Sequence, residues 1–85
     1  MNFLSGLIDK KTEKIINIFL KNPNEFYHIN KVSIESKVPL STTFRIINKL
    51  VKNDFLEIKY ISKFKIYKLK ENEKTKKLKL LFDKK

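Results

Sequence analysis

The sequence contains no cysteine and no alanine, and it has only one glycine and two prolines in 85 residues. Without cysteine there is no disulfide and no thiol chemistry, which is consistent with a reducing compartment, so we expect a cytoplasmic protein. Long apolar runs are also missing. The longest, residues 15–20, is interrupted by Asn17, whereas a membrane span needs roughly 18 apolar residues. The first residues lack the basic segment and the small-residue cleavage site of a signal peptide.

Acidic residues are scarce as well. The chain has 9 Asp and Glu against 20 Lys and Arg, which gives a net charge of +11 and a pI of about 9.9. More than half of this excess lies in residues 38–70, where eight basic side chains accompany two acidic ones, a local charge of +6. A charge of this sign predicts an acidic partner, with nucleic acid first and an anionic membrane surface second.

Residue sets that carry catalysis or hold metals are not found in the sequence. There is no Ser-His-Asp set, no motif with paired carboxylates and no phosphate-binding loop, so we expect no enzyme. His28 is the only histidine, and without a second histidine or a cysteine near it we expect an ordinary strand residue and no metal site. No cofactor and no small-molecule ligand are predicted.

Apolar spacing predicts a single, mostly helical α+β domain over residues 1–85. A first helix is expected over residues 7–21, before Pro23, and a short β-rich run over residues 26–29. Asn30 is the expected N-cap of a brief helix over residues 31–36.

The second half of the domain begins at a turn, because Pro39 disfavours helical geometry at the residue before it. Ser41 is the expected cap of a helix that ends near residue 53. Two strand-like runs, residues 56–61 and 64–69, predict a β-hairpin. Its two-residue link has neither Gly nor Asn, so a type I′ turn is not expected. A last helix is expected over residues 71–85.

The stretch between the turn and the hairpin resembles the helix-turn-helix of small archaeal and bacterial regulators of the TrmB, IclR and MarR kind. The residues that match the pattern of these families are Val38, Pro39, Ser41, Thr42, Phe44, Arg45, Ile47, Leu50, Asp54, Phe55 and Leu56. The resemblance implies a winged helix-turn-helix, with a three-helix core, the helix-turn-helix at residues 31–53, a hairpin wing at residues 56–69 and an extra C-terminal helix. Two positions that are usually glycine in these families are Lys37 and Asp54.

The resemblance places the outer face of the helix at residues 41–53 in the major groove of double-stranded DNA. The implied DNA-binding residues on this helix are Ser41, Thr42, Arg45, Asn48, Lys49 and Lys52, and those on the wing are Lys63 and Lys65. Arg45 is the only arginine in a chain otherwise biased to lysine. Its planar fork of donors matches guanine O6 and N7 together, whereas a lysine is a point charge. The alternatives are a phosphate contact, an ion pair with Glu57 or Asp54, and a chance position without a role.

Two further predictions concern apolar residues. Ile61 and Phe64, near the tip of the hairpin, are expected to pack onto the domain, the alternative being that they touch the sugars of bound DNA. The terminal helices hold more apolar residues than a small core needs, namely Phe3, Leu4, Leu7, Ile8, Leu78, Leu81 and Phe82. We therefore expect a homodimer formed through the N- and C-terminal helices, the alternative being that both ends fold back onto their own domain.

Taken with the charge, these patterns predict a sequence-specific regulator of transcription that binds double-stranded DNA and represses. Two alternatives remain open at this point. One is a winged-helix subunit that binds proteins within a larger transcription or nucleoprotein assembly. The other is a peripheral membrane protein that uses its Lys-rich last helix.

Overall fold

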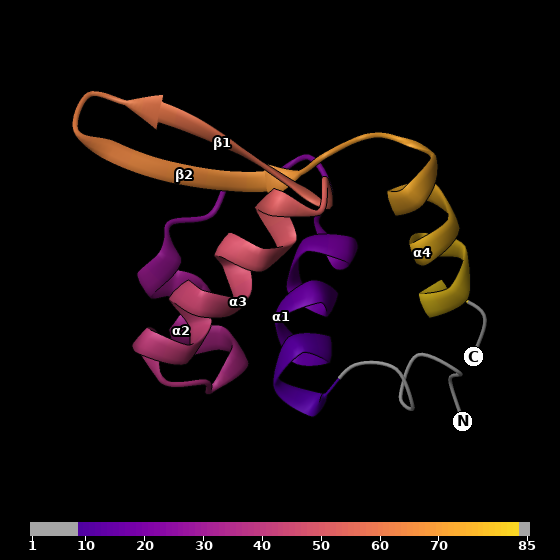
Figure 1. Ribbon diagram of the computed structural model, residues 1–85, viewed down its shortest axis with the longest axis horizontal. Helices are drawn as coiled ribbons and strands as arrows, with labels where there is room; N and C mark the ends of the chain where they lie inside the picture. The colour runs from indigo at the N-terminus through magenta and orange to yellow at the C-terminus, as the bar shows by residue number, and fades with distance from the viewer. Residues whose placement is uncertain (1–8, 84–85) are drawn as a thin grey trace.

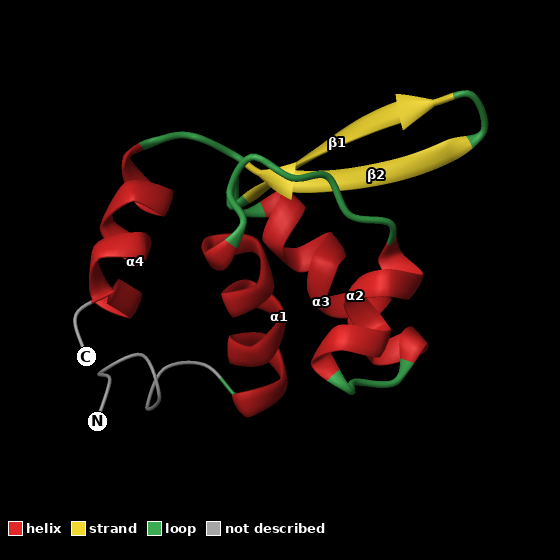
Figure 2. Cartoon of the chain, turned by 180° about the vertical axis from the view of Figure 1, so that it is seen from behind, coloured by secondary structure: helices red, strands yellow, loops and turns green. Residues whose placement is uncertain are grey.

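The computed structural model describes residues 9–83. Its elements, in chain order, are α1 (Lys10–Lys21), α2 (Ile29–Ser36), α3 (Leu40–Lys52), β1 (Leu56–Ile61), β2 (Phe64–Leu69) and α4 (Glu73–Asp83). Helices α1, α2 and α3 form one compact group, the β1–β2 hairpin projects from it, and α4 lies beside α1 (Figures 1 and 2). The predicted fold class, a winged helix-turn-helix with an additional C-terminal helix, is confirmed.

One apolar core joins the three helices to the base of the hairpin. Ile15 and Phe19 of α1, Val32 of α2 and Ile47 of α3 are fully buried. The ring of Phe19 meets that of Tyr27 edge to face, with 5.3 Å between centroids. Burial of each such side chain stabilises the fold by roughly 1.5–3 kcal/mol, so the core, rather than any surface pair, holds the helices together.

The hairpin is antiparallel, with its register running from Leu56 opposite Leu69 to Ile61 opposite Phe64. Tyr27 extends it by a single bridge to Tyr67, through reciprocal backbone hydrogen bonds of 2.7 and 2.8 Å. At the base, Leu56, Leu69 and Tyr67 are buried, whereas the tip is exposed on both strands. The outer half of the hairpin therefore extends beyond the helices that cover its base (Figure 1).

The bounds of both strands were predicted correctly, but two helix caps were not. The cap of α2 is His28, whose Nδ1 accepts a hydrogen bond from the backbone N–H of Asn30 at 3.2 Å. Helix α3 begins at Leu40, because the N–H of Thr43 already donates to the carbonyl of Pro39 at 2.9 Å. Ser41 thus lies in the first turn and does not cap the helix.

Left-handed backbone occurs at three non-glycine residues among those described: Lys37 (φ 59°), Asp54 (φ 65°) and Ser62 (φ 55°). The first two are the positions where the resembled families usually have glycine, the residue for which this conformation is least costly. Ser62 is the first residue of the hairpin turn, and the φ of Lys63 is not positive. A type I′ turn, which needs positive φ at both residues, is therefore excluded, as predicted.

Two hydroxyls hold the turn between α2 and α3. Ser33 donates to the carbonyl of Val38 at 2.6 Å, and Thr43 donates to the same oxygen at 3.2 Å. Both helices are thereby tied to one backbone group of the turn. This fixes the angle at which α3 leaves α2, and with it the direction of the outer face of α3.

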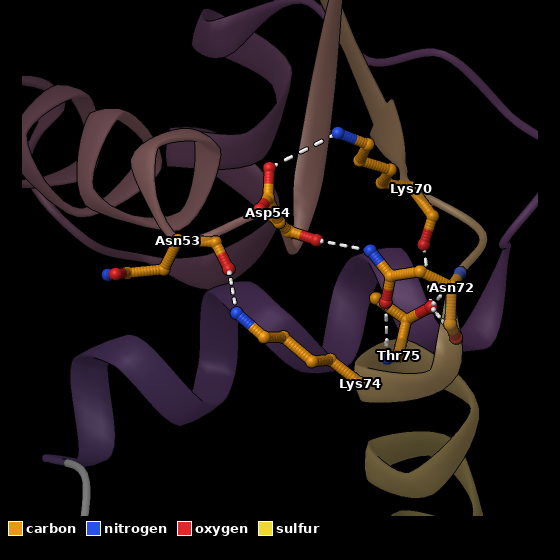
Figure 3. Close-up of polar contacts among 6 residues, drawn as sticks. All are labelled: Asn53, Asp54, Lys70, Asn72, Lys74 and Thr75. Atoms are coloured by element: carbon orange, nitrogen blue, oxygen red, sulfur yellow. Dashed lines mark hydrogen bonds and ion pairs between the residues drawn. The ribbon is translucent and has the colours of Figure 1, made fainter.

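Helix α4 is attached where α3 ends (Figure 3). The Asn72 amide donates to the carbonyl of Asp54 at 2.8 Å, the Lys70 ammonium lies 3.1 Å from the Asp54 carboxylate, and Lys74 donates to the carbonyl of Asn53 at 3.4 Å. Thr75 is buried and donates to the carbonyl of Lys70 at 2.6 Å. These polar contacts of residues 70–75 thus hold the first turn of α4 against the end of α3.

The apolar residues of α4 are not exposed in the way that the dimer prediction required. Leu78 is buried in the core of its own domain, because it lies three residues after the buried Thr75 on the same side of the helix. Its assignment to a dimer seam was wrong. Leu81 is half-buried, and Leu80, which was not singled out, is 65% exposed. The predictions for residues 3–8 and for the side chain of Phe82 lie outside the described residues.

Candidate nucleic-acid interface

The two sides of α3 differ sharply. Its buried residues, Thr43, Ile46, Ile47 and Leu50, follow a spacing of three, one and three residues and form one stripe. At 100° per residue, the centre of the opposite side passes through Ser41, Arg45, Asn48 and Lys52. All four are exposed. The structure therefore brings four of the six residues predicted on this helix onto one solvent-facing line.

The remaining two predicted residues of α3 flank this line. Lys49 is exposed, and Thr42 is half-buried at the margin of the core. Helix α3 contains Arg45, Lys49 and Lys52 and no Asp or Glu. Its outer face is therefore uniformly positive along nearly four turns. We name the six residues Ser41, Thr42, Arg45, Asn48, Lys49 and Lys52 the α3 face.

Arg45 takes part in none of the hydrogen bonds or ion pairs found among residues 9–83. Asp54, one of the two carboxylates considered as its partner, instead pairs with Lys70. The charge of Arg45 acts instead on the carboxylate of Asp9, the N-cap of α1. The pKa of Asp9 is lowered, first by its hydrogen bond from Thr12 at 2.7 Å and further by the charges of Arg45 and Lys11. Within residues 9–83, the Arg45 side chain is therefore exposed and close enough to Asp9 for their charges to interact.

The wing supplies four lysines in two settings. Lys63, in the turn, and Lys65, opposite Tyr60, are exposed, with the Lys65 ammonium 6.0 Å from the Tyr60 ring centroid. Lys59 and Lys68 both lie over the ring of Phe26, each at 5.5 Å from its centroid. The charges nearest the tip are therefore those of Lys63 and Lys65, the two wing residues predicted to bind DNA.

Several exposed apolar residues near this surface were not predicted. Ile61 and Phe64 are 56% and 60% exposed, so the expectation that they pack onto the domain was wrong. The hairpin tip extends past the helices, although the Phe64 ring still meets that of His28 edge to face. Leu40 and Phe44, one turn apart on α3, are each 48% exposed. The spacing could have indicated this for Phe44, which lies on the flank of the buried stripe, but not for Leu40, which lies two turns before Ile47 and in line with the stripe.

Groups that would hold a metal do not occur within the described chain: no three His, Cys, Asp or Glu side chains gather in a suitable cluster. Across residues 9–83, no helix is both long enough and apolar enough to cross a bilayer. The features that stand out are thus a positive helix face and a basic hairpin, both suited to binding an anionic surface.

Solved structures share this architecture. The protein AF1382 from Archaeoglobus fulgidus is 18% identical, with 94% of this chain and 88% of that chain covered at a TM-score of 0.75. The homodimeric winged helix-turn-helix DNA-binding domain of Mb0332 from Mycobacterium bovis is 13% identical, with 93% and 69% covered at a TM-score of 0.70. Sso10a-2, a DNA-binding protein from Sulfolobus solfataricus, is 26% identical, with 82% and 72% covered at a TM-score of 0.64.

These likenesses show that the chain has the winged helix-turn-helix fold. In sequence, it matches no protein-family model and no curated protein.

Proposed function

We propose that this protein is a sequence-specific regulator of transcription that binds double-stranded DNA as a homodimer and represses. The observation that carries the proposal is the α3 face, which lies opposite the buried stripe of its helix and bears three positive and no negative charges. Two of the similar structures are described as DNA-binding, and one of these as homodimeric, which supports the same reading. Because its partner is genomic DNA, we place the protein in the cytoplasm.

The dimensions of α3 suit the major groove. A helix with its side chains is about 10–12 Å wide, and the groove is about 12 Å wide. With the α3 face inward, the fork of Arg45 is suited to guanine O6 and N7, and the amide of Asn48 to adenine. The N-terminus of α3 has no side-chain cap in the described structure, so its first amides, with the hydroxyls of Ser41 and Thr42, can donate to a phosphate.

The wing then contacts the neighbouring backbone or minor groove. Lys63 and Lys65 are exposed at its outer half and carry point charges, which suit phosphates rather than base edges. Lys49 and Lys52, at the end of α3, supply further phosphate contacts. In this arrangement Arg45 and Asn48 carry specificity, and the lysines carry affinity.

A second copy is proposed to dock through α4. Leu80 is 65% exposed and Leu81 half-buried on this helix, so a two-fold pair would cover both. Such a pair would present two α3 faces to successive major grooves, about 34 Å apart, and would read an inverted repeat. Repression follows most simply, because a bound dimer can occlude a promoter without contacting other proteins.

The test is binding of the purified protein to fragments of its source genome, followed by titration of the preferred fragment with salt. If about three of the four lysines of each protomer reach a phosphate at one time, a dimer neutralises about six phosphates, and the slope of log affinity against log salt is about −5. Lys49→Gln with Lys52→Gln should make this slope shallower by roughly two per protomer. The matched control is Lys14→Gln with Lys21→Gln on α1, which removes the same charge from exposed positions outside the α3 face. A wild-type slope near zero would refute the proposal.

One observation favours a second candidate, a subunit that binds proteins within a nucleoprotein assembly. Leu40 and Phe44 are half-exposed on the flank of α3, and Ile34 of α2 is 76% exposed. Exposed apolar side chains of this kind are typical of protein contacts. If the wild type fails to bind duplex DNA at low salt, while Phe44→Ser abolishes its association with a purified transcription complex, this second function replaces the first.

A further inference from the structure

The tip of the hairpin is unusually apolar for an exposed turn. Tyr60, Ile61 and Phe64 are 64%, 56% and 60% exposed, and they flank the two-residue link Ser62–Lys63. Projecting turns are normally polar, because an exposed apolar hairpin tip invites aggregation. Three large apolar side chains at this point therefore indicate a surface that is covered in the working state of the protein.

The tip is also preorganised. Ile61 and Phe64 are directly opposite each other in the register, so their side chains project from the same face of the hairpin. The Phe64 ring contacts the imidazole of His28 edge to face, with 6.1 Å between centroids. The left-handed Ser62 closes the turn without a loop that would separate the two residues. The Ile61–Phe64 pair thus forms a narrow apolar edge with a defined position.

The charges around this edge identify the class of its partner. Lys63 follows Ile61 by two residues, Lys65 follows Phe64, and Lys59 lies two residues before Ile61, while Glu57, at the base, is the only acidic residue of the two strands. An apolar edge between positive charges matches the minor groove, where sugars and base edges lie between two phosphate rows. A membrane surface also combines these chemistries, but stable attachment needs a larger apolar face than one hairpin tip.

We propose that Ile61 and Phe64 form a wedge that enters the minor groove next to the site read by α3 and partly unstacks one base step. Two paired strands are about 4.8 Å apart before side chains are added, and the groove is about 6 Å wide. The tip therefore enters only if the groove opens, and opening at a wedge bends the duplex towards the major groove. This inference rests on the proposed binding of duplex DNA, and it adds deformation of that DNA.

The experiment places 2-aminopurine at successive steps of the preferred fragment and measures its fluorescence, with bending measured in parallel by energy transfer between the fragment ends. For the wild type we expect increased fluorescence at one step per half-site and a bend. Ile61→Ser with Phe64→Ser should abolish both and weaken binding by at least about tenfold, which is the smallest loss expected if even one of the two side chains is buried in the complex. The footprint of α3 should persist.

Lys63→Ala is the matched control, because it changes the same turn without changing the wedge. It should lower the salt slope by about one per site and leave the fluorescence increase intact. The melting temperature of the double serine variant should fall by no more than about 5 °C, because both side chains are more than half exposed and only their cross-strand pair and the ring contact of Phe64 with His28 are lost. This separates loss of the wedge from loss of the fold.

Three results would overturn the wedge. A wild-type footprint without any change in fluorescence or bend shows that the tip lies on undistorted DNA, while the proposed function stands. The absence of any footprint removes both proposals. Binding of the wild type, but not of the double serine variant, to vesicles with 30% anionic lipid, with an unchanged footprint in both, assigns the tip to a membrane.

Discussion

Replacing Arg45 by lysine separates the three roles that a lone arginine on the α3 face could have. The substitution keeps the positive charge and loses the planar pair of donors. If the fork binds guanine O6 and N7, the lysine variant should lose ~1–3 kcal/mol on the preferred sequence. At about 1.4 kcal/mol per factor of ten, this is a loss of roughly 5- to 150-fold in specific affinity.

The structure sets what should not change. Arg45 is exposed, and its side chain makes no ion pair or hydrogen bond within residues 9–83, so stability should change by less than about 0.5 kcal/mol. Affinity for random DNA should be nearly unchanged, because that term depends on charge. The assay is a competition gel shift with the preferred fragment against random duplex, together with thermal unfolding followed by circular dichroism.

Each alternative leaves its own signature. A phosphate clamp would be largely replaced by lysine, so the ratio of specific to random affinity would persist, and base readout by Arg45 would be refuted. A structural role through the nearby Asp9 carboxylate would lower the melting temperature while changing specificity little. Lys63→Ala in the wing provides the contrast, because it should weaken binding to all sequences about equally.

Three further predictions concern the fold and the assembly. Lys37→Gly should stabilise the domain by roughly 0.5–1 kcal/mol, because a φ of 59° is costly for a residue with a Cβ. Thermal unfolding measures this gain, and an equal gain from Lys37→Ala would contradict the explanation by backbone conformation. Leu80→Lys should convert the proposed dimer to the 10.2 kDa monomer in sedimentation, whereas a wild type that is already monomeric with and without DNA would exclude the α4 seam. Burial raises the pKa of Tyr67 above its ordinary 10.0, so the stability that its neutral form contributes is present below pH 10 and is lost as pH rises through the raised value. Above pH 10, Tyr67→Phe should therefore unfold less readily than the wild type. Identical unfolding profiles of the two proteins at alkaline pH would contradict this.

Much of the fold could be predicted because its signals are local. The sequence predicted a helix that ends near residue 53, and the resemblance assigned its outer face, where four of the six predicted residues lie opposite the buried stripe. The two strands were bounded correctly, and the resemblance pointed to residues 37 and 54, where the backbone is left-handed. The N-caps of the helices were harder to predict from the sequence. His28 caps α2 because its segment pairs with β2 through Tyr27, and this pairing joins residues 40 positions apart.

The errors at the tip and in α4 have one physical cause. Whether an apolar side chain is buried depends on what lies beneath it, and a periodic pattern does not report this. Ile61 and Phe64 continue the strands past the edge of the helical core, so they are exposed although their types favour burial. Leu78 contacts the core only because the segment before α4 turns that helix onto α1, and Leu80 then faces outward.

The junction in Figure 3 links the parts of the proposed interface. Asp54 follows α3, Lys70 follows β2, and Asn72 precedes α4. Their hydrogen bond and ion pair, together with the bond from the Lys70 N–H to the carbonyl of Phe55 at 3.0 Å, join all three elements within a few residues. The exposed ion pair contributes little to stability, but the Asn72 amide bond and the Lys70 backbone bond connect α3, the wing and α4. If the protein forms the proposed two-fold dimer through α4, the spacing of the two half-sites is set at this junction, because α4 would place the partner and Asp54 follows the helix proposed to read the DNA.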